Sequence, residues 1–198
     1  MNEQRHGHCE RRSRETQIEC SVCLDGSGKG DIHTGIGFFD HMLEAMSRFA
    51  RMDVMIRCQG DLDVDGHHTV EDTGICLGRA IREALGDRSG IVRAAHAYMP
   101  MDEALAFCVI DISGRPYLAF DASFDHPMCG GMDTQLAEEF FRALAVQAGL
   151  TVHMRLESGR NDHHRMEALF KAFGLALHSG ACRDSGVQGV LSTKGLLD

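Results

Sequence analysis

The sequence predicts an α+β fold that consists of one unit repeated within the chain. The pattern His-His-x-x-Glu occurs twice, from His67 to Glu71 and from His163 to Glu167, at a spacing of 96 positions (163 minus 67). In both halves the hydrophobic pattern gives the order strand, strand, helix, strand, helix. A chain of 198 residues suits one domain of ordinary size, or two small halves that share a core.

The first half begins with an alternating run, which is typical of a half-buried strand, and turn-forming residues follow it. Its last helix carries the first His-His pair and ends before Gly86, a residue suited to closing a helix. In order, we expect a strand from Thr16 to Asp25, an extended segment from Asp31 to Gly37, a helix from Phe38 to Met46, a strand from Met52 to Cys58 and a helix from His67 to Leu85.

The second half follows the same order after a short linker near residues 88–97. We expect strands from Ala104 to Ser113 and from the turn Gly114-Arg115-Pro116 to Phe120, a helix from Asp133 to Ala148, a strand from Leu150 to Glu157 and a helix from His163 to His178. The chain then divides into a disordered N-terminal tail (1–12), a first α+β repeat (13–92), a second α+β repeat (93–185) and a C-terminal phosphate-binding tail (186–198).

The two halves can be aligned residue by residue. Matching Arg57 with Arg155 gives a spacing of 98 (155 minus 57), and the same spacing places His41 opposite Glu139 (139 minus 41). Each half therefore carries a possible ligand in its first helix as well as in its second.

Composition excludes several classes of protein. A formal charge of −9 without a long basic run argues against a nucleic-acid partner. No apolar run approaches the ~20 residues that cross a bilayer, and the polar N-terminus lacks the apolar core of a secretory signal. The eight cysteines are scattered, and Cys20 and Cys23 would face opposite sides of a strand. We expect free thiols in a reducing, cytoplasmic setting.

The repeated pattern predicts metal binding. On a helix, positions four apart share a face, so His67 and Glu71 can hold one ion while His68 points elsewhere. Imidazole and carboxylate ligands suit Mn²⁺, Fe²⁺ or Zn²⁺ with positions open for substrate. Surface histidines are the alternative, but both copies keep the glutamate at the same offset. Neighbouring Asp40, Asp72 and Asp162 would either orient imidazoles or serve as plain caps.

Positive charges in three places could hold an anion. They are Arg93, Arg115 and the hydroxyl-rich run Ser192-Thr193-Lys194-Gly195 near the C-terminus. Hydroxyls followed by lysine and glycine suit a phosphate group. Beside a two-metal centre, these groups favour a small phosphorylated substrate.

Seven motifs resemble the imidazoleglycerol-phosphate dehydratase family, and the resemblance extends from Arg14 to Leu196. They are Thr34 to Leu43 (TGIGFFDHML), Asp65 to Asp72 (DGHHTVED), Pro100 to Leu105 (PMDEAL), Asp111 to Leu118 (DISGRPYL), Asn161 to Glu167 (NDHHRME), Phe170 to Phe173 (FKAF) and Ser192 to Gly195 (STKG). The resemblance implies dehydration of imidazole glycerol phosphate to imidazole acetol phosphate in histidine biosynthesis, by way of a metal-bound imidazolate.

The resemblance also implies a fold and an assembly. Each half would be a four-stranded sheet with helices on one face, the ribosomal protein S5 domain 2-like fold. Trimers would assemble into a homo-oligomer of 24 subunits, with active sites at subunit interfaces and two Mn²⁺ ions in each. Two ligand sets are implied, namely His41, His68, His163 and Glu167 for one ion, and His67, Glu71, His164 and Glu139 for the other.

Further roles follow from the matched motifs. Glu15 matches a substrate-contacting glutamate, and Glu15, Glu71 and Glu167 are the candidate proton carriers. The residues implied to bind phosphate are Arg93, Arg115, Lys171, Ser192, Thr193 and Lys194.

The chain departs from the family pattern at a few positions. Glu139 stands where the family often has histidine, Ala45 and Phe49 replace glutamine and histidine, and Leu191 replaces proline. A carboxylate also ligates Mn²⁺, but it makes the surroundings of that ion more anionic. Two other functions use the same residues: a two-metal hydrolase or phosphatase acting on a small phosphorylated substrate, and a non-catalytic metal-binding shell protein.

Overall fold

Two four-stranded sheets form the frame of the molecule in a computed structural model that describes residues 4–197. The first sheet has the order β1-β2-β4-β3, with β1 (His6–Arg12), β2 (Thr16–Cys23), β3 (Gly30–His33) and β4 (Asp53–Gly60). The second has the order β5-β6-β10-β7, with β5 (Ala94–Met101), β6 (Ala104–Asp111), β7 (Tyr117–Asp121) and β10 (Thr151–Ser158). A small hairpin pairs β8 (Met128–Cys129) with β9 (Met132–Asp133).

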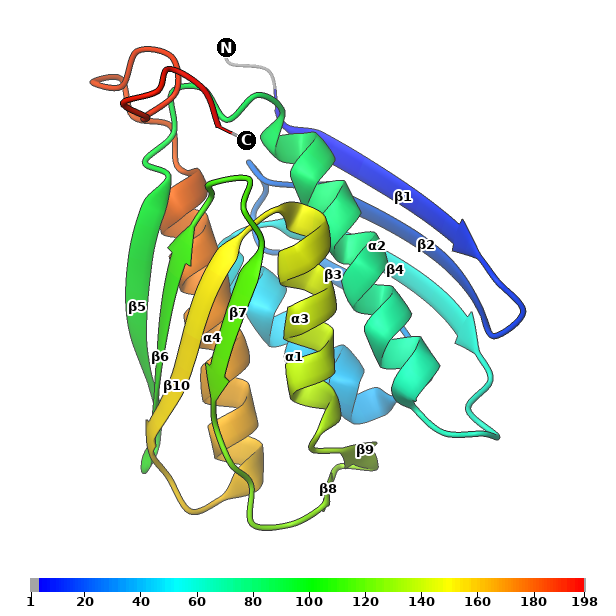
Figure 1. The fold of residues 1–198 in the computed structure, drawn as a ribbon. Helices are drawn as coiled ribbons and strands as arrows, with labels where there is room; N and C mark the ends of the chain where they lie inside the picture. The colour runs from blue at the N-terminus through cyan, green and yellow to red at the C-terminus, as the bar shows by residue number, and fades with distance from the viewer. Residues whose placement is uncertain (1–3, 198) are drawn as a thin grey trace.

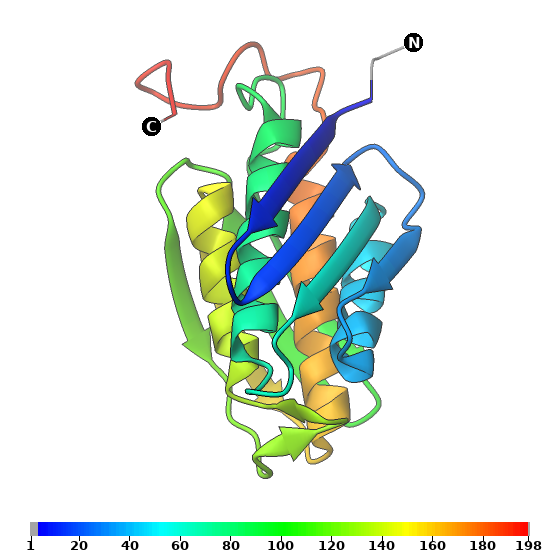
Figure 2. The same cartoon turned by 90° about the vertical axis from the view of Figure 1, so that its right-hand side faces the viewer.

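Four helices lie between the two sheets (Figures 1 and 2). They are α1 (Gly37–Ala50) and α2 (His67–Leu85) from the first half, and α3 (Leu136–Ala148) and α4 (Asp162–Ala181) from the second. In both sheets the strand before the first helix runs parallel to its neighbour, β3 along β4 and β7 along β10, while the other pairs are antiparallel. The predicted duplicated α+β fold is therefore confirmed.

The helices pack across the two halves, α2 along α3 and α1 along α4. Gly78 and Gly174, at the duplication spacing of 96 (174 minus 78), allow both close approaches. A Cβ atom on Gly78 would lie 2.6 Å from the Leu144 carbonyl oxygen, and one on Gly174 would lie 2.4 Å from that of Met46. Because these contacts leave no room for a side chain, the backbones of the paired helices touch directly.

A cluster of phenylalanines joins the halves into one core. The rings of Phe39 and Phe140 are 5.2 Å apart, those of Phe140 and Phe170 are 5.3 Å apart, and those of Phe141 and Phe173 are 5.3 Å apart. All five side chains are fully buried. Aromatic packing between α1, α3 and α4 therefore fixes how these helices, which carry His41, Glu139 and His163, lie relative to one another.

The structure corrects the predicted disordered N-terminal tail (1–12) for residues 4–12. Residues 6–12 form β1, which pairs along its length with β2 and faces Cys9 to Cys20; residues 1–3 lie outside the described part of the chain. The expected linker near residues 88–97 also ends early, because β5 begins at Ala94. No helix within residues 4–197 is long and apolar enough to cross a membrane.

Candidate active site

His41, His163 and Glu167 bring three metal-binding side chains together where α1 meets α4. The Nε2 atoms of His41 and His163 lie 3.6 Å and 3.2 Å from Glu167 Oε2. Within residues 4–197 these three form the one group of His, Cys, Asp and Glu donors whose ligand atoms all lie within 4.8 Å of one another. The donor set of two imidazoles and a carboxylate fits Mn²⁺, Fe²⁺ or Zn²⁺. We call it the α1/α4 half-site.

The start of α4 is fixed by a side-chain cap. The Asn161 side-chain oxygen accepts hydrogen bonds from the backbone N–H groups of His163 (2.9 Å) and His164 (3.4 Å). Such a cap satisfies donors that the first turn of a helix leaves free. His163 and Glu167 then lie one turn apart on the face of α4 that looks toward α1.

Lys171 completes the surroundings of the α1/α4 half-site. Its ammonium group forms an ion pair with Glu167 one turn along α4 and lies 5.3 Å from the centre of the Phe49 ring. Burial opposes ionisation of Glu167, but the hydrogen bond and charge of Lys171 outweigh it, so the pKa of Glu167 falls below its usual value. Glu167 is therefore held as a carboxylate, the form that binds a metal.

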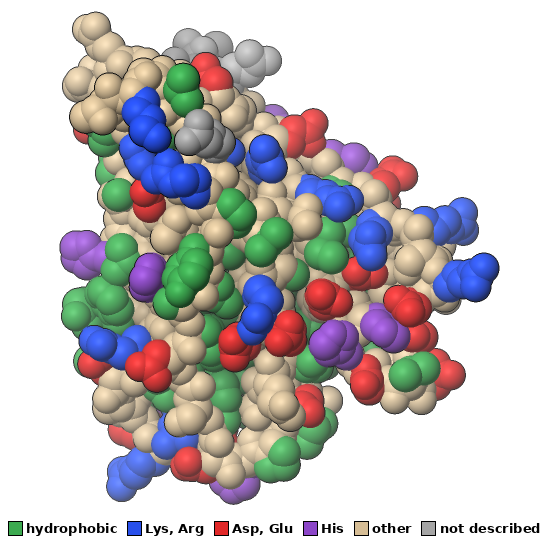
Figure 3. Space-filling view, in the orientation of Figure 1, with side chains coloured by type: hydrophobic (Ala, Val, Ile, Leu, Met, Phe, Trp, Pro, Cys, Tyr) green, Lys and Arg blue, Asp and Glu red, His purple; other side chains and the backbone are tan. Residues whose placement is uncertain are grey.

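The other helix pair, α2 and α3, carries the residues that correspond to these ligands. His67 Nε2 lies 3.7 Å from Glu71 Oε2 on one face of α2. Glu139, on the first turn of α3, borders the same cleft of about 680 Å³ as His67. Figure 3 shows acidic and histidine side chains side by side over the adjoining ends of these helices. We call His67, Glu71 and Glu139 the α2/α3 half-site.

The second histidine of each pair points away from the first, as the helical spacing predicts. Ring planes meet at 88° for His67 and His68 and at 82° for His163 and His164. His68 Nδ1 lies 3.0 Å from Asp61 Oδ2, and its Nε2 is 3.7 Å from Glu15. A carboxylate on one ring nitrogen orients the imidazole and leaves the other nitrogen as a possible ligand.

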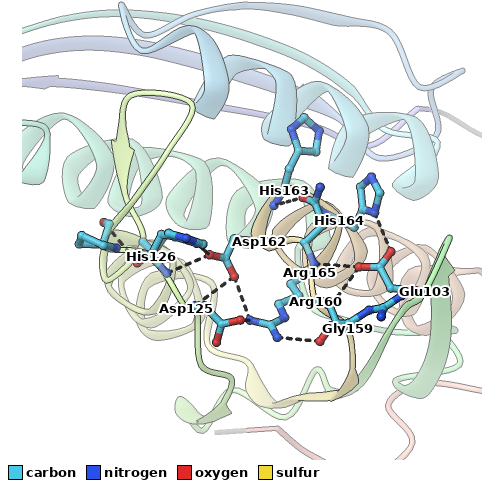
Figure 4. Close-up of polar contacts among 12 residues, drawn as sticks. Glu103, Asp125, His126, Gly159, Arg160, Asp162, His163, His164 and Arg165 are labelled. Carbon is cyan, nitrogen blue, oxygen red and sulfur yellow. Dashed lines mark hydrogen bonds and ion pairs between the residues drawn. The ribbon is translucent and has the colours of Figure 1, made fainter.

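His164 is held in the same way by Glu103 (Figure 4). The Nδ1–Oε2 distance is 2.8 Å, and the hydrogen bond raises the pKa of His164. Hydrogen bonds from His164 and from the backbone N–H groups of Asn161 and Arg160 lower the pKa of Glu103 to about 2. Asp61 and Glu103, to which the sequence analysis gave no role, are therefore the two carboxylates that orient these imidazoles.

The three aspartates considered as orienting groups have other partners. Asp40 accepts from the backbone and hydroxyl of Thr34, Asp72 accepts from the Thr16 hydroxyl, and Asp162 contacts His126. None of these contacts involves one of the candidate ligands. The structure therefore favours the capping and loop-fixing role for all three.

Most of the residues predicted to bind phosphate line one pocket. Arg93, Arg115, Ser192, Thr193 and Lys194 border a cavity of about 680 Å³ beside the C-terminal segment. Arg93 forms a two-pronged contact with Asp111, at 2.7 and 3.0 Å, and also donates to the Leu191 carbonyl. Arg93 thus ties the segment that carries the hydroxyls to β6. Lys171 is not among the lining residues and lies at the α1/α4 half-site instead.

Fold and site together define a protein of the duplicated α+β type, with a group of possible metal ligands where α1 meets α4. The family model described as imidazoleglycerol-phosphate dehydratase matches residues 34–177. The chain belongs to this family, whose members are carbon–oxygen hydro-lyases of histidine biosynthesis.

Relatives and solved structures agree over almost the whole chain. The chain is 52% identical to the imidazoleglycerol-phosphate dehydratase of Desulfitobacterium hafniense over 195 residues, which covers 98% of this chain and 100% of that protein. The crystal structure of the Staphylococcus aureus enzyme gives a TM-score of 0.81 at 41% identity, covering 90% of this chain and 99% of that one. The crystal structure of the Pyrococcus furiosus enzyme gives a TM-score of 0.82 at 36% identity, covering 96% of this chain and 100% of that one.

Proposed function

We propose that the protein dehydrates imidazole glycerol phosphate to imidazole acetol phosphate in a Mn²⁺-dependent reaction of histidine biosynthesis. The observation that carries the proposal is the convergence of His41, His163 and Glu167, with donor atoms within 4.8 Å of one another. Family membership supports the substrate and the reaction.

We assign two metal ions to each active site. One would be held by His41, His68, His163 and Glu167, and the other by His67, Glu71, Glu139 and His164. Divalent ions held by these ligands would act as Lewis acids and as a template for the imidazole and hydroxyl of the substrate. The Nε2 atoms of His68 and His164, on the side of each ring away from Asp61 and Glu103, would supply the fourth ligand of each set.

The protein's own carboxylates carry the protons. Glu15, Glu71 and Glu167 are the candidates, because each lies beside an imidazole of the site. Lys171 keeps Glu167 ionised and lowers its pKa, so Glu167 would be a weak base and suits metal binding better than proton transfer. Glu15 lies 3.7 Å from Nε2 of His68, which places its carboxylate next to the position proposed for a metal ion.

The phosphate group anchors the substrate away from the reacting carbons. Arg115, Ser192, Thr193 and Lys194 bind it in the pocket that they share with Arg93. Because the phosphate takes no part in the reaction, the binding energy of these contacts can be used to fix the position of the imidazole, which lowers the barrier to the chemical step. Lys171 would contribute its charge at the metal side of the substrate.

A homo-oligomer completes the site. The outer face of the second sheet exposes Tyr98 and Tyr117, whose rings pack on Phe107 (4.7 Å) and His153 (5.8 Å). Figure 3 shows hydrophobic side chains exposed over that sheet, and an exposed apolar face of this kind suits a contact with another copy of the chain. The resemblance extends the proposal to 24 subunits built from trimers. The eight free cysteines support a reducing cytoplasm.

The decisive test is turnover of imidazole glycerol phosphate by metal-stripped protein after Mn²⁺ is added back. We expect an enolisable keto product and no free phosphate, and we expect His68→Ala and Glu167→Ala to reduce turnover to background. Phosphate release would favour the hydrolase instead. Full activity in either variant would contradict the ligand assignment.

A further inference from the structure

The duplication makes the two half-sites directly comparable. His67 corresponds to His163 and Glu71 to Glu167 at the spacing of 96, and Glu139 corresponds to His41 at the spacing of 98. The supporting elements also correspond, because α1 packs on α4 as α3 packs on α2. The half-sites therefore differ in one ligand type, an imidazole on α1 and a carboxylate on α3.

The neighbouring charges do not cancel this difference. At the α1/α4 half-site one carboxylate, Glu167, faces one ammonium group, that of Lys171. At the α2/α3 half-site there are two carboxylates, Glu71 and Glu139; Arg142 lies 3.6 Å from Glu139 but also pairs with Glu138. The α2/α3 half-site therefore has more negative charge than its counterpart.

The remaining ligand is alike on both sides. His68 and His164 are both imidazoles whose Nδ1 atoms are held by carboxylates, at 3.0 Å and 2.8 Å. Whichever half-site each completes, it adds the same kind of nitrogen. The complete set at α1/α4 has three imidazoles and one carboxylate, whereas the set at α2/α3 has two imidazoles and two carboxylates.

We infer that Glu139 makes the two metal positions chemically unequal, with a nitrogen-rich position at α1/α4 and an oxygen-rich position at α2/α3. Carboxylate oxygens suit Mn²⁺ and Mg²⁺, whereas added imidazole favours Zn²⁺ and other later metals. Zn²⁺ should therefore displace Mn²⁺ first from the α1/α4 position. The inference rests on the proposed function, since it takes the two-ion site as given.

Competition in the intact assembly tests the inequality. Zn²⁺ is titrated into the Mn²⁺-loaded protein, and released Mn²⁺ is followed by electron paramagnetic resonance. For the unmodified chain we expect two separate release steps, spaced by ~10-fold or more in Zn²⁺, the size of effect that even an outer partner of a metal ligand can have. A single step would overturn the inference.

The internal duplication supplies matched variants. Glu139→His should merge the two steps at the lower Zn²⁺ concentration, and His41→Glu should merge them at the higher one. Glu139→Gln keeps an oxygen donor but removes the charge, so it should move the second release step to a lower Zn²⁺ concentration. This variant replaces Glu139→His in the test if size-exclusion chromatography shows that Glu139→His does not assemble. Two unchanged steps in Glu139→His, or in Glu139→Gln, would contradict the assignment.

The outcome is separable from that of the proposed reaction. If Mn²⁺ is released in two steps but the protein does not dehydrate imidazole glycerol phosphate, the proposed function is wrong and the inference of two unequal metal positions is supported. Turnover accompanied by a single release step in the unmodified chain would overturn the inequality alone.

Discussion

At the scale of single residues, Glu103 gathers three hydrogen-bond donors on one carboxylate. It accepts from the backbone N–H groups of Arg160 (3.0 Å) and Asn161 (2.8 Å), and it lies 2.8 Å from His164 Nδ1. The backbone donors fix the carboxylate, and the carboxylate fixes the ring. The direction of His164 Nε2 is thus set by the turn before α4 rather than by the helix alone.

Glu103→Gln is expected to weaken Mn²⁺ binding by ~10- to 100-fold, because the imidazole loses its charged acceptor. Mn²⁺ titration followed by electron paramagnetic resonance measures the change. Asp102→Asn is the matched control, since Asp102 lies 3.8 Å from the other ring nitrogen and makes no hydrogen bond to it. Equal losses in the two variants would contradict an orienting role for Glu103.

The same contact predicts a pH dependence of stability in metal-free protein. The pKa of Glu103 falls from 4.5 to about 2, so its contribution is present above pH 4.5 and is lost as the pH falls through about 2. The pKa of His164 is raised above 6.5, so its contribution is present below pH 6.5 and is lost as the pH rises through the raised value. Both contributions are fully present only between pH 4.5 and pH 6.5. The melting-temperature difference between wild type and Glu103→Gln should therefore be largest in that range.

The histidine pairs were predictable from sequence and their orienting carboxylates were not. The spacing of His163 and Glu167 fixes their relation within one helix, whatever the rest of the chain does. Glu103 reaches His164 across 61 positions, through the pairing of β6 with β10. Such a contact depends on strand register, which local spacing does not encode.

At the scale of secondary structure, four strands were not predicted from the sequence: the two strands of the β8–β9 hairpin and the edge strands β1 and β5. β1 places only Gly7 and Cys9 in the buried layer, and β5 contains Pro100. Small inward residues give a weak hydrophobic alternation, and proline is tolerated at the edge of a sheet because one side needs no backbone donor. The central strands, which have stronger alternation, were predicted close to their observed bounds.

The contact between α1 and α4 gives a prediction for stability. Gly174→Ala would place a Cβ atom 2.4 Å from the Met46 carbonyl oxygen and 3.1 Å from the Ala50 amide nitrogen. Separating the helices is expected to cost ~1–3 kcal/mol of unfolding free energy. Gly37→Ala, at a helix position with no atom within 4 Å, is the control and should leave stability unchanged or slightly higher. Urea unfolding measures both, and equal effects would refute the close-approach explanation.

At the scale of the whole molecule, the proposed assembly depends on its metal ions. Ligands supplied by neighbouring chains would hold the subunits together, and imidazoles must be neutral to bind. Chelation with EDTA, or acidification, is therefore expected to disperse the oligomer into smaller species. Size-exclusion chromatography with and without EDTA measures this, and an unchanged large peak under both treatments would contradict it.

The duplicated arrangement of half-sites also has a genetic consequence. If a complete site takes one half-site from each of two chains, a chain with a substitution only at α1/α4 and a chain with a substitution only at α2/α3 can together form an intact site. Co-assembly of inactive His163→Ala and His67→Ala chains in equal amounts would then leave roughly one site in four with both halves intact, if mixing at interfaces is random. A duplication inside one polypeptide thus becomes complementation between two alleles.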